Sequence, residues 1–357
     1  MSSRYKVPLV AVFVAVALPA AAQQSLESPQ LSLLASWGCA ECSGAELLGE
    51  IQSVTLAPNG TAYALDSFEP AIRIFVRDQP AGAFGQEGEG PGEFQLASFA
   101  GAAPSGLEVI DTRHRRISRL TYSGDLVDTR RLTGFPTYAS YDTETGTWYF
   151  ATMDWASGGA RVTRLEPLGS DPIAVGPTDF PLSDKGTLAG FYPIAARPGG
   201  GFAVGDGARE YRIRIYSDSG DLRHEIHRPL ERMARTPAEM EFEQERMAMG
   251  AAAMARLANA EGGTRTMPEV DPLKRHFYVH ALRYDDHGRL WVLTRRGNEN
   301  HSIFDIYSPT GADLGEVSVP GMVDRFDVRG QRLLTAGITE DWVPVVRLWD
   351  LEDSAQR

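Results

Sequence analysis

The sequence predicts an all-β chain built from repeated antiparallel units. Turn glycines followed by a short strand of alternating apolar residues recur along the chain, at Gly60, Gly106, Gly146, Gly200, Gly288 and Gly330. A polar break and a second alternating strand follow each of them, such as AIRIFVR in the first unit and YRIRIYS in the fourth. A period of two residues between Gly, Asp and Asn turns is typical of antiparallel strands joined by hairpins.

The spacing of these units predicts how the strands assemble. The glycines lie 40–54 residues apart, except for a gap of 88 residues between Gly200 and Gly288. Repeats of about 40 residues with four short strands are typical of a β-propeller, in which each unit forms one blade of a ring. We therefore expect a six-bladed β-propeller of four-stranded antiparallel blades, although the length of 357 residues alone suggests two domains.

The two ends of the repeat region bear on how the ring closes. The last unit stops after VVRLWDL without an outer strand, and the segment Leu31 to Trp37 precedes the first unit without a unit of its own. An unpaired sheet edge favours aggregation. We expect residues 31–37 to pair with the last blade and close the ring.

The N-terminus has the pattern of a secretion signal. Arg4 and Lys6 precede the apolar run Val7 to Leu18, and small residues follow up to Ala22. The run is shorter than the roughly 20 residues needed to span a bilayer. We expect a signal peptide at 1–22, cleavage near Ala22, one propeller domain at 23–357, and a periplasmic or secreted product without a membrane span.

The charge balance limits the classes of ligand. The chain has 35 Lys and Arg against 47 Asp and Glu, a formal net charge of -12, which becomes -14 once Arg4 and Lys6 are removed. An acidic protein repels polyphosphate, so nucleic acid is not an expected partner. The charge favours a cationic or neutral ligand over an anionic one.

The sequence has only two cysteines, Cys39 and Cys42. In an oxidising compartment this pair predicts a local disulfide. Covalent haem attachment is excluded because Ser43 stands where a histidine is required. A redox or metal-binding role, or a reduced pair, stays open as an alternative.

A helical insertion interrupts the strand pattern at about 231–267. Residues 236–239 (TPAE) form a capping box with proline in the first helical position, so we expect a helix from there to about Asn259. Four methionines fall seven residues apart, Met233, Met240, Met247 and Met254, and the last three share one helical face. The simpler interpretation is that this face packs on the propeller or covers its opening. A pliable binding face or a copper site is the alternative.

The first unit has the sequence LAPNGTAYALDSFEPAIRIFVRD, followed by the loop AGAFGQEGEGPGEF. It resembles the NHL-type repeat of exported bacterial six-bladed propellers, with the pattern of that repeat at Asp66, Arg73, Ile74, Gly92 and Phe94. Similar Asp and Arg-Ile pairs occur at Asp111 with Arg116-Ile117 and at Asp206 with Arg212-Ile213. The resemblance implies the fold more than the function, because the architecture hosts many activities.

Two sets of side chains are candidates for chemistry at the axis. Carboxylates at similar strand ends could form a ring that holds a divalent metal, namely Asp66, Asp111, Asp154 and Asp206. The simpler interpretation is that each Asp caps its own turn and pairs with the following Arg. His276 and His280 share a face of a regular strand, about 13 Å apart, so they cannot chelate a metal by themselves. A three-histidine zinc centre, as in amidating lyases of similar fold, is a further alternative.

These observations favour a binding protein over an enzyme. The sequence contains no G-x-S-x-G elbow, phosphate-binding glycine loop or H-E-x-x-H helix. We expect a monomeric, exported binding or scaffold protein without a cofactor, which recognises a peptide, glycan or partner protein on one ring face. The alternative hypothesis is a hydrolase or lyase, lactonase-like or amidating-lyase-like, that uses a divalent metal at the axis.

Overall fold

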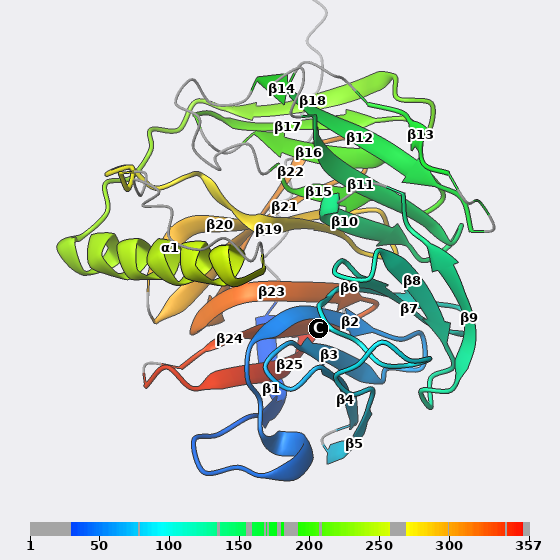
Figure 1. The fold of residues 1–357 in the computed structure, drawn as a ribbon. Helices are drawn as coiled ribbons and strands as arrows, with labels where there is room; N and C mark the ends of the chain where they lie inside the picture. The colour runs from blue at the N-terminus through cyan, green and yellow to red at the C-terminus, as the bar shows by residue number, and fades with distance from the viewer. Residues whose placement is uncertain are drawn as a thin grey trace, which may run out of the picture.

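The computed structural model describes residues 30–352, apart from 78, 134–135, 155–158, 168, 170, 177–179, 182–191, 207–208, 258–268, 299 and 340. Its strands form six antiparallel sheets around a central axis (Figure 1). The predicted six-bladed β-propeller is therefore confirmed. The predicted signal peptide lies outside the described residues.

The six blades follow one another along the chain. Blade 1 contains β2 (Ile51–Leu56), β3 (Ala62–Asp66), β4 (Ala71–Val76) and β5 (Gln79–Phe84). Blade 2 contains β6 (Ala97–Ala103), β7 (Gly106–Asp111), β8 (Arg116–Leu120) and β9 (Leu126–Arg131). Blade 3 contains β10 (Pro136–Asp142), β11 (Thr147–Asp154), β12 (Gly159–Leu165) and the short β13 (Ile173–Ala174) and β14 (Phe180–Pro181).

The second half of the ring repeats this arrangement. Blade 4 contains β15 (Ile194–Ala196), β16 (Phe202–Asp206), β17 (Tyr211–Tyr216) and β18 (Leu222–Arg228). Blade 5 contains β19 (Phe277–Tyr284), β20 (Leu290–Asn298), β21 (His301–Tyr307) and β22 (Asp313–Pro320). Blade 6 contains β23 (Met322–Arg329), β24 (Arg332–Ile338) and β25 (Pro344–Glu352), with β1 (Gln30–Trp37) as its outer strand.

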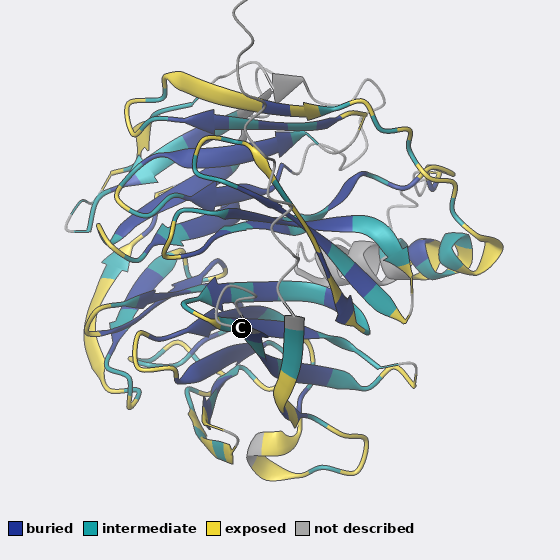
Figure 2. Ribbon diagram, turned by 180° about the vertical axis from the view of Figure 1, so that it is seen from behind, coloured by how far each residue is buried: buried dark blue, intermediate teal, exposed yellow. Residues whose placement is uncertain are grey.

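The first strand of each blade lies next to the axis. These inner strands contact one another in a closed circle, in the order β2, β6, β10, β15, β19, β23 and back to β2. Large buried side chains fill the space between blades, and Figure 2 shows that burial runs along the strands while exposure concentrates at loops and rim. A side chain on an inner strand is therefore the one best placed to reach the centre of the ring.

The ring closes through β1, as predicted. Trp37 pairs with Val346 at one end of β1, and Gln30 pairs with Glu352 at the other. Trp37 is 3% exposed and stacks on Phe75 of blade 1, with ring centroids 4.3 Å apart. The N-terminal strand thus completes blade 6 and also joins it to blade 1.

Five of the six predicted turn glycines adopt the left-handed backbone that favours glycine, with φ between 55° and 111°: Gly60, Gly146, Gly200, Gly288 and Gly330. Gly106 differs because it is the first residue of β7 and lies in the strand itself. A Cβ there would approach the carbonyl oxygen of Leu120 to 2.0 Å, so close strand packing requires glycine at this position.

The insertion forms one helix, α1 (Pro237–Leu257). Its start follows the predicted capping box: Thr236 N donates to Glu239 Oε2 at 2.8 Å, and Glu239 N donates to Thr236 Oγ1 at 3.2 Å. Phe242 contacts Trp342 in the β24–β25 turn, with centroids 4.9 Å apart. The helix lies in front of the sheets in Figure 1 and behind them in Figure 2, so it lies on the ring face seen in Figure 1, beside β19 and β20, and projects beyond the rim.

The disulfide and the search for membrane-spanning helices concern two further predictions from the sequence. Cys39 and Cys42 form the predicted disulfide, in the connection between β1 and β2. Within the described part of the chain, no helix has both the length and the apolar character needed to cross a membrane.

Candidate ligand site at the ring axis

Asp66 and Asp111 lie one strand away from the axis, where each caps a turn. Asp66 Oδ1 accepts from Phe68 N at 3.0 Å, and its Oδ2 accepts from Gly49 N at 2.9 Å. Arg73 lies 3.5 Å from Asp66, as the repeat pattern predicts. Gly49 must be glycine here, since a Cβ would lie 2.3 Å from Cβ of Phe68.

Asp111 ties the connection between blades 1 and 2 to its own turn. Its carboxylate accepts from the backbone N–H groups of Gln95 and Arg113 at 3.0 and 3.1 Å, and lies 2.7 Å from His114 Nδ1. The pKa of Asp111 is lowered: burial raises it, but the hydrogen bonds from Gln95 and His114 outweigh burial. Arg116, the predicted ion partner, donates instead to carbonyl oxygens of the β5–β6 connection.

The other two aspartates end the second strands of blades 3 and 4. Asp206 is the last residue of β16 and pairs with Arg212 on β17. Burial of Tyr192 raises the pKa of this tyrosine to about 12, and the negative charge of Asp206 contributes to the rise. Asp154 ends β11, and its side chain lies outside the part that the structure describes. The aspartates therefore occupy equivalent positions in separate blades, each one strand out from the centre.

His276 lies just before β19, beside blade 4. Its ring centroid is 6.1 Å from that of Tyr211, and its Nε2 has no hydrogen-bond partner among the described residues. Burial lowers its pKa, although a hydrogen bond to the backbone of Arg209 opposes the effect.

An irregularity in β19 separates His276 from His280. Phe277 pairs with Thr294 and Leu282 pairs with Val292, so five steps along β19 match two steps along β20. The inner strands β2, β6, β10 and β23 each carry a single extra residue, whereas β19 carries three. We call residues 278–281 the blade-5 bulge. The two histidines accordingly do not share one face of a regular strand. Bulges commonly redirect side chains near functional sites.

The blade-5 bulge carries His280 into the centre of the ring. Its imidazole contacts Tyr138 on β10 edge-on, with centroids 5.1 Å apart, and Phe99 on β6 at 6.4 Å. Within the described residues the imidazole makes no hydrogen bond. Burial lowers the pKa of His280 well below its usual value, and the charges of Arg325 and Arg283 lower it further.

Two arginines on inner strands lie within electrostatic reach of His280. Arg325 on β23 donates from Nε to Gln52 O at 2.9 Å, across the junction of blades 6 and 1. Arg283 on β19 donates to Leu282 O at 2.9 Å, and burial lowers its pKa. Asp327 attracts Arg283, but its Oδ2 is already held by Thr55 Oγ1 and Leu56 N.

The first turns of α1 form ion pairs with the chain on both sides of the insertion. Glu239 forms an ion pair with Lys274, and Glu243 lies 3.9 Å from Arg235. Within the blade-5 bulge, the guanidinium carbon of Arg295 lies over the ring of Tyr278, 4.8 Å from the ring centroid. Burial raises the pKa of Tyr278. The ion pair with Lys274 therefore holds the start of α1 against the segment that leads into β19.

One cluster of the described residues has the spacing of a metal site, and it lies away from the axis. Asp285, Asp286 and His287, in the β19–β20 turn, place ligand atoms within 4.8 Å of one another. Asp285 already accepts from Arg289 Nε at 2.6 Å and Trp291 Nε1 at 3.2 Å. Asp286 accepts from Gly330 N at 3.0 Å. Structural bonds thus hold the buried Asp285, whereas Asp286 is exposed and accepts from one backbone N–H. The histidines and aspartates predicted from the sequence are not part of this cluster.

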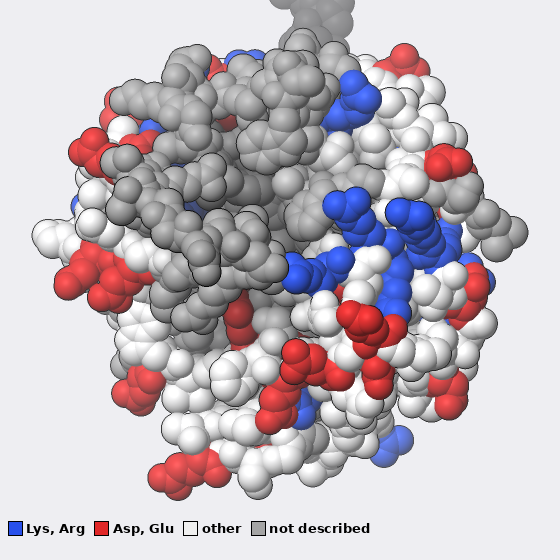
Figure 3. All heavy atoms as spheres, viewed as in Figure 1, with Lys and Arg blue, Asp and Glu red and all other residues white. Residues whose placement is uncertain are grey.

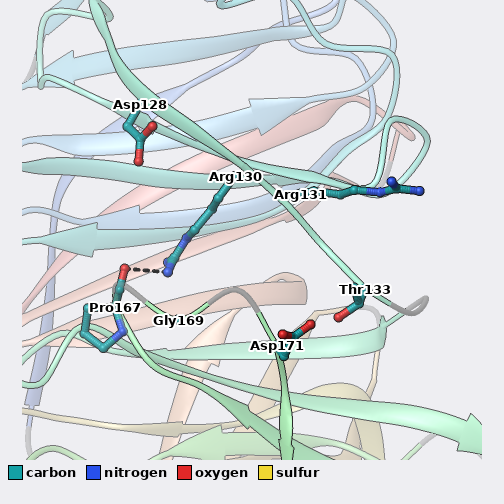
Figure 4. Close-up of a pocket in the computed structure, with 7 residues that line it drawn as sticks. All are labelled: Asp128, Arg130, Arg131, Thr133, Pro167, Gly169 and Asp171. Atoms are coloured by element: carbon teal, nitrogen blue, oxygen red, sulfur yellow. Dashed lines mark hydrogen bonds between the residues drawn. The ribbon is translucent and has the colours of Figure 1, made fainter.

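A hollow of about 320 Å³ lies between the rims of blades 2 and 3 (Figure 4). Arg130 projects into it but donates to Pro167 O and, at 2.7 Å, to Glu108 Oε2. Asp128 and Asp171 line other parts of it. Its main charged group is thus already engaged within the fold.

Charge is unevenly distributed over the face that carries α1. Figure 3 shows basic side chains gathered beside the centre of the ring, over blades 2 and 3, and acidic ones gathered below them. Exposed arginines of blade 2 include Arg115 and Arg131. This face therefore has a local group of positive charges, although the chain as a whole is negatively charged.

No protein-family model matches the chain, and no curated protein matches its sequence. Solved structures do match it: a DUF4221 family member from Bacteroides vulgatus has a TM-score of 0.52 at 11% identity, covering 92% of this chain and 100% of its own. A Bacteroides fragilis protein named as a candidate exported protein has a TM-score of 0.50 at 12% identity, covering 90% and 95%. A gluconolactonase from Xanthomonas campestris has a TM-score of 0.48 at 14% identity, covering 91% and 90%. Similarity at these identities shows the propeller fold alone.

Sequence reasoning included His280 but missed the residues around it. The recurring glycines mark the second strand of each blade, so the pattern does not identify the inner strands. Arg283 and Arg325 lie in ordinary strand sequences, LRYD and DRFD, and the blade-5 bulge leaves no signature. These residues come together only through the way the inner strands pair in the folded ring.

Proposed function

We propose that this chain is an exported binding protein of the NHL-like six-bladed type, which takes a peptide, glycan or partner protein on the face that carries α1. In this proposal residues 1–22 form a cleaved signal peptide, and residues 23–357 form one monomeric propeller domain in the periplasm or outside the cell.

The single observation that carries this proposal is the position of His280. Inner strands of blades 2, 3 and 5 bring Phe99, Tyr138 and His280 together at the centre of the ring. An aromatic wall beside a polar ring without an internal hydrogen bond is typical of a ligand site, where few polar groups fix orientation. The inner strand β19 has three extra residues where β2, β6, β10 and β23 each have one, and the blade-5 bulge places the imidazole there.

The local charge favours binding over metal-dependent hydrolysis. Arg283 and Arg325 act on His280 as like charges, and a divalent cation beside them would be repelled in the same way. The oxygens of Asp66 and Asp111 are engaged by backbone N–H groups of their own turns and connections. A metal held by these carboxylates would have to break those bonds.

Arrays of immobilised peptides and glycans test this proposal with fluorescently labelled protein. The variant His280→Ala removes the central imidazole, and His287→Ala removes an exposed imidazole on the turn that follows β19. We expect wild type and His287→Ala to retain the same specific spots and His280→Ala to lose them. Equal binding by all three proteins would contradict a site at the axis.

A further inference from the structure

Trp342 is a large aromatic side chain that the fold leaves in contact with solvent. It lies in the turn between β24 and β25 and is 61% exposed. Its backbone has a φ of 64°, in the left-handed region that glycine adopts readily and that is unfavourable for a bulky residue. Hydrogen bonds from Trp342 N to Thr339 O at 3.0 Å and from Val343 N to Thr339 Oγ1 at 3.2 Å close the turn. Neither the exposure nor the backbone of Trp342 favours stability, so a role in binding is the better explanation of this residue.

The indole of Trp342 is paired with an aromatic residue of α1. The ring centroids of Trp342 and Phe242 are 4.9 Å apart, and the ring planes are inclined by 48°. Phe242 is half-buried, whereas more than half of Trp342 stays accessible. The ion pair between Glu239 and Lys274 fixes the helical turn before Phe242. The two rings, which we call the Trp342–Phe242 pair, are therefore held in place before any ligand binds, and this lowers the entropic cost of binding.

The helix beside this pair is acidic. The first nine residues of α1, at 237–245, contain four glutamates and no basic residue, and the first basic residue of the helix is Arg246. Glu241 and Glu245 are exposed, and neither forms an ion pair within 4.0 Å with a described residue. Glu241 precedes Phe242, and Glu245 follows it by three positions, so both carboxylates are neighbours of the ring on the helix surface.

The turn that carries Trp342 adds further negative charge. Its sequence is TEDW, and Asp341 is exposed and has no ion partner within 4.0 Å in the described part of the chain. Figure 3 shows a group of acidic side chains at the edge of this face, where the start of α1 lies in Figure 1. Several carboxylates of one sign attract a cation to the surface around the two rings.

We propose that the Trp342–Phe242 pair binds a cationic side chain of a peptide, arginine or lysine, on the exposed face of the indole. Glu241, Glu245 and Asp341 supply the opposite charge around it. The inference goes beyond the proposed function because it assigns a second site on the α1 face, and it rests on that function only in taking a peptide as the ligand.

Charge favours a cation over the other ligands that an exposed indole can take. The face of an aromatic ring is negative, and tryptophan attracts a cation within about 6 Å of the ring centre more strongly than tyrosine or phenylalanine. A neutral sugar ring would gain contact area on the indole but nothing from the surrounding carboxylates. The formal net charge of -12 adds a long-range attraction for a basic peptide.

Fluorine NMR of protein labelled with 5-fluorotryptophan tests the inference. The Trp342 signal is assigned with Trp342→Phe, which lacks it. The probes are three tripeptides, Gly-Arg-Gly, Gly-Lys-Gly and Gly-citrulline-Gly, acetylated and amidated so that a side chain carries the only charge. Citrulline has nearly the shape of arginine without its charge, and cellotriose is added as a neutral sugar. Each probe is raised to about 50 mM, above the Kd of weak millimolar binding.

We expect a saturable shift of the Trp342 signal with the arginine and lysine probes and none with the citrulline probe. The variant Phe242→Leu keeps an apolar side chain but removes the second ring. Its Kd for the arginine probe should rise about 2- to 5-fold, the range of an exposed contact between a cation and an aromatic ring.

A matched pair of double variants tests the carboxylates. Glu241→Gln with Glu245→Gln should raise the Kd for the arginine probe about 2- to 5-fold, as expected for exposed charge pairs. Glu87→Gln with Glu89→Gln removes the same charge from an exposed connection between blades 1 and 2 and should leave the Kd unchanged. The comparison separates local contacts from the effect of net charge.

Three results would overturn the inference: no saturable shift with either basic probe, equal Kd values for the arginine and citrulline probes, or equal Kd values in wild type and the α1 double variant. A response to cellotriose without one to the peptides would also overturn it and would make the pair a sugar platform. Thermal melting confirms that each variant is folded. His280→Ala should leave the Trp342 shift unchanged, so the array test of the axis and this test can fail separately.

Discussion

His280 and Tyr138 lie on inner strands of blades 5 and 3, yet their rings meet edge-on with centroids 5.1 Å apart. Blade 4 separates these strands around the ring, so the contact is made across the axis. It depends on the blade-5 bulge, because the extra residues displace the backbone of β19 from its pairing with β20. Residues 142 positions apart in the sequence are thereby combined in one site that no sequence motif marks.

The position of His280 predicts how stability depends on pH. Arg325 from β23 and Arg283 from β19 face it as charges, Tyr138 from β10 and Phe99 from β6 face it as rings, and its pKa is lowered well below the usual value of about 6.5. The unfolded chain therefore binds a proton that the folded chain excludes. The stability contributed by the neutral ring is present above about pH 6.5 and is lost as the pH falls below it.

The variant His280→Gln should accordingly lose less stability than wild type between pH 7 and 5. Arg283→Gln removes one source of the lowered pKa and should reduce the loss as well. Urea unfolding at several pH values measures both effects. Identical pH profiles for wild type and His280→Gln would show that the imidazole is not held in its neutral form.

Ring closure predicts unequal effects of two substitutions on one strand. Trp37 is buried and stacks on Phe75, so Trp37→Ala should lower the free energy of unfolding by about 3–5 kcal/mol. Leu33 on the same strand is 52% exposed, so Leu33→Ala should cost less than about 1 kcal/mol. Denaturant unfolding compares them, and similar losses would contradict the role of Trp37 in joining blades 6 and 1.

The turn cap at Asp111 predicts a stability loss that depends on pH. Asp111→Asn weakens charge-assisted hydrogen bonds from Gln95, Arg113 and His114, at an expected cost of about 1–3 kcal/mol near pH 7. Because the folded pKa of Asp111 is lowered, its contribution is present above about pH 4 and is lost as the pH falls through the folded pKa.

The difference between Asp111→Asn and wild type should therefore shrink in acid. The exposed Asp128, whose carboxylate accepts from Thr129 N, provides the control, and Asp128→Asn should change stability by less than about 0.5 kcal/mol. A cost for Asp111→Asn that stays constant down to pH 3 would mean that its charge does not stabilise the turn.

The sequence predicts the ring well because its repeat is local. Turn glycines such as Gly60 and the capping box at Thr236 report on neighbouring residues, and the structure agrees with both. The strand ending at Trp37 was predictable for another reason, because the last unit lacked an outer strand, and it pairs there with Val346. The site is different, because side chains reach the axis through register. A three-residue shift in β19 changes which residues face the centre, and no alternating pattern records it.

The same reason explains the fate of the aspartates. Their similar places at the ends of strands correctly predict equivalent positions in successive blades, as Asp66 and Asp111 show. Equivalent positions converge on the axis only when they lie on inner strands, whereas these residues end second strands. Their carboxylates therefore meet the backbone of their own turns instead of one another.

The most direct test of the account is whether the ring axis holds a metal ion. The purified protein is exposed to zinc and calcium, dialysed, and then analysed for its metal content. The repulsion expected beside Arg283 and Arg325 predicts far less than one metal ion per chain, with the same content in His280→Ala. One retained ion per chain in wild type, lost in His280→Ala, would contradict the binding site proposed here and favour a metal-dependent enzyme.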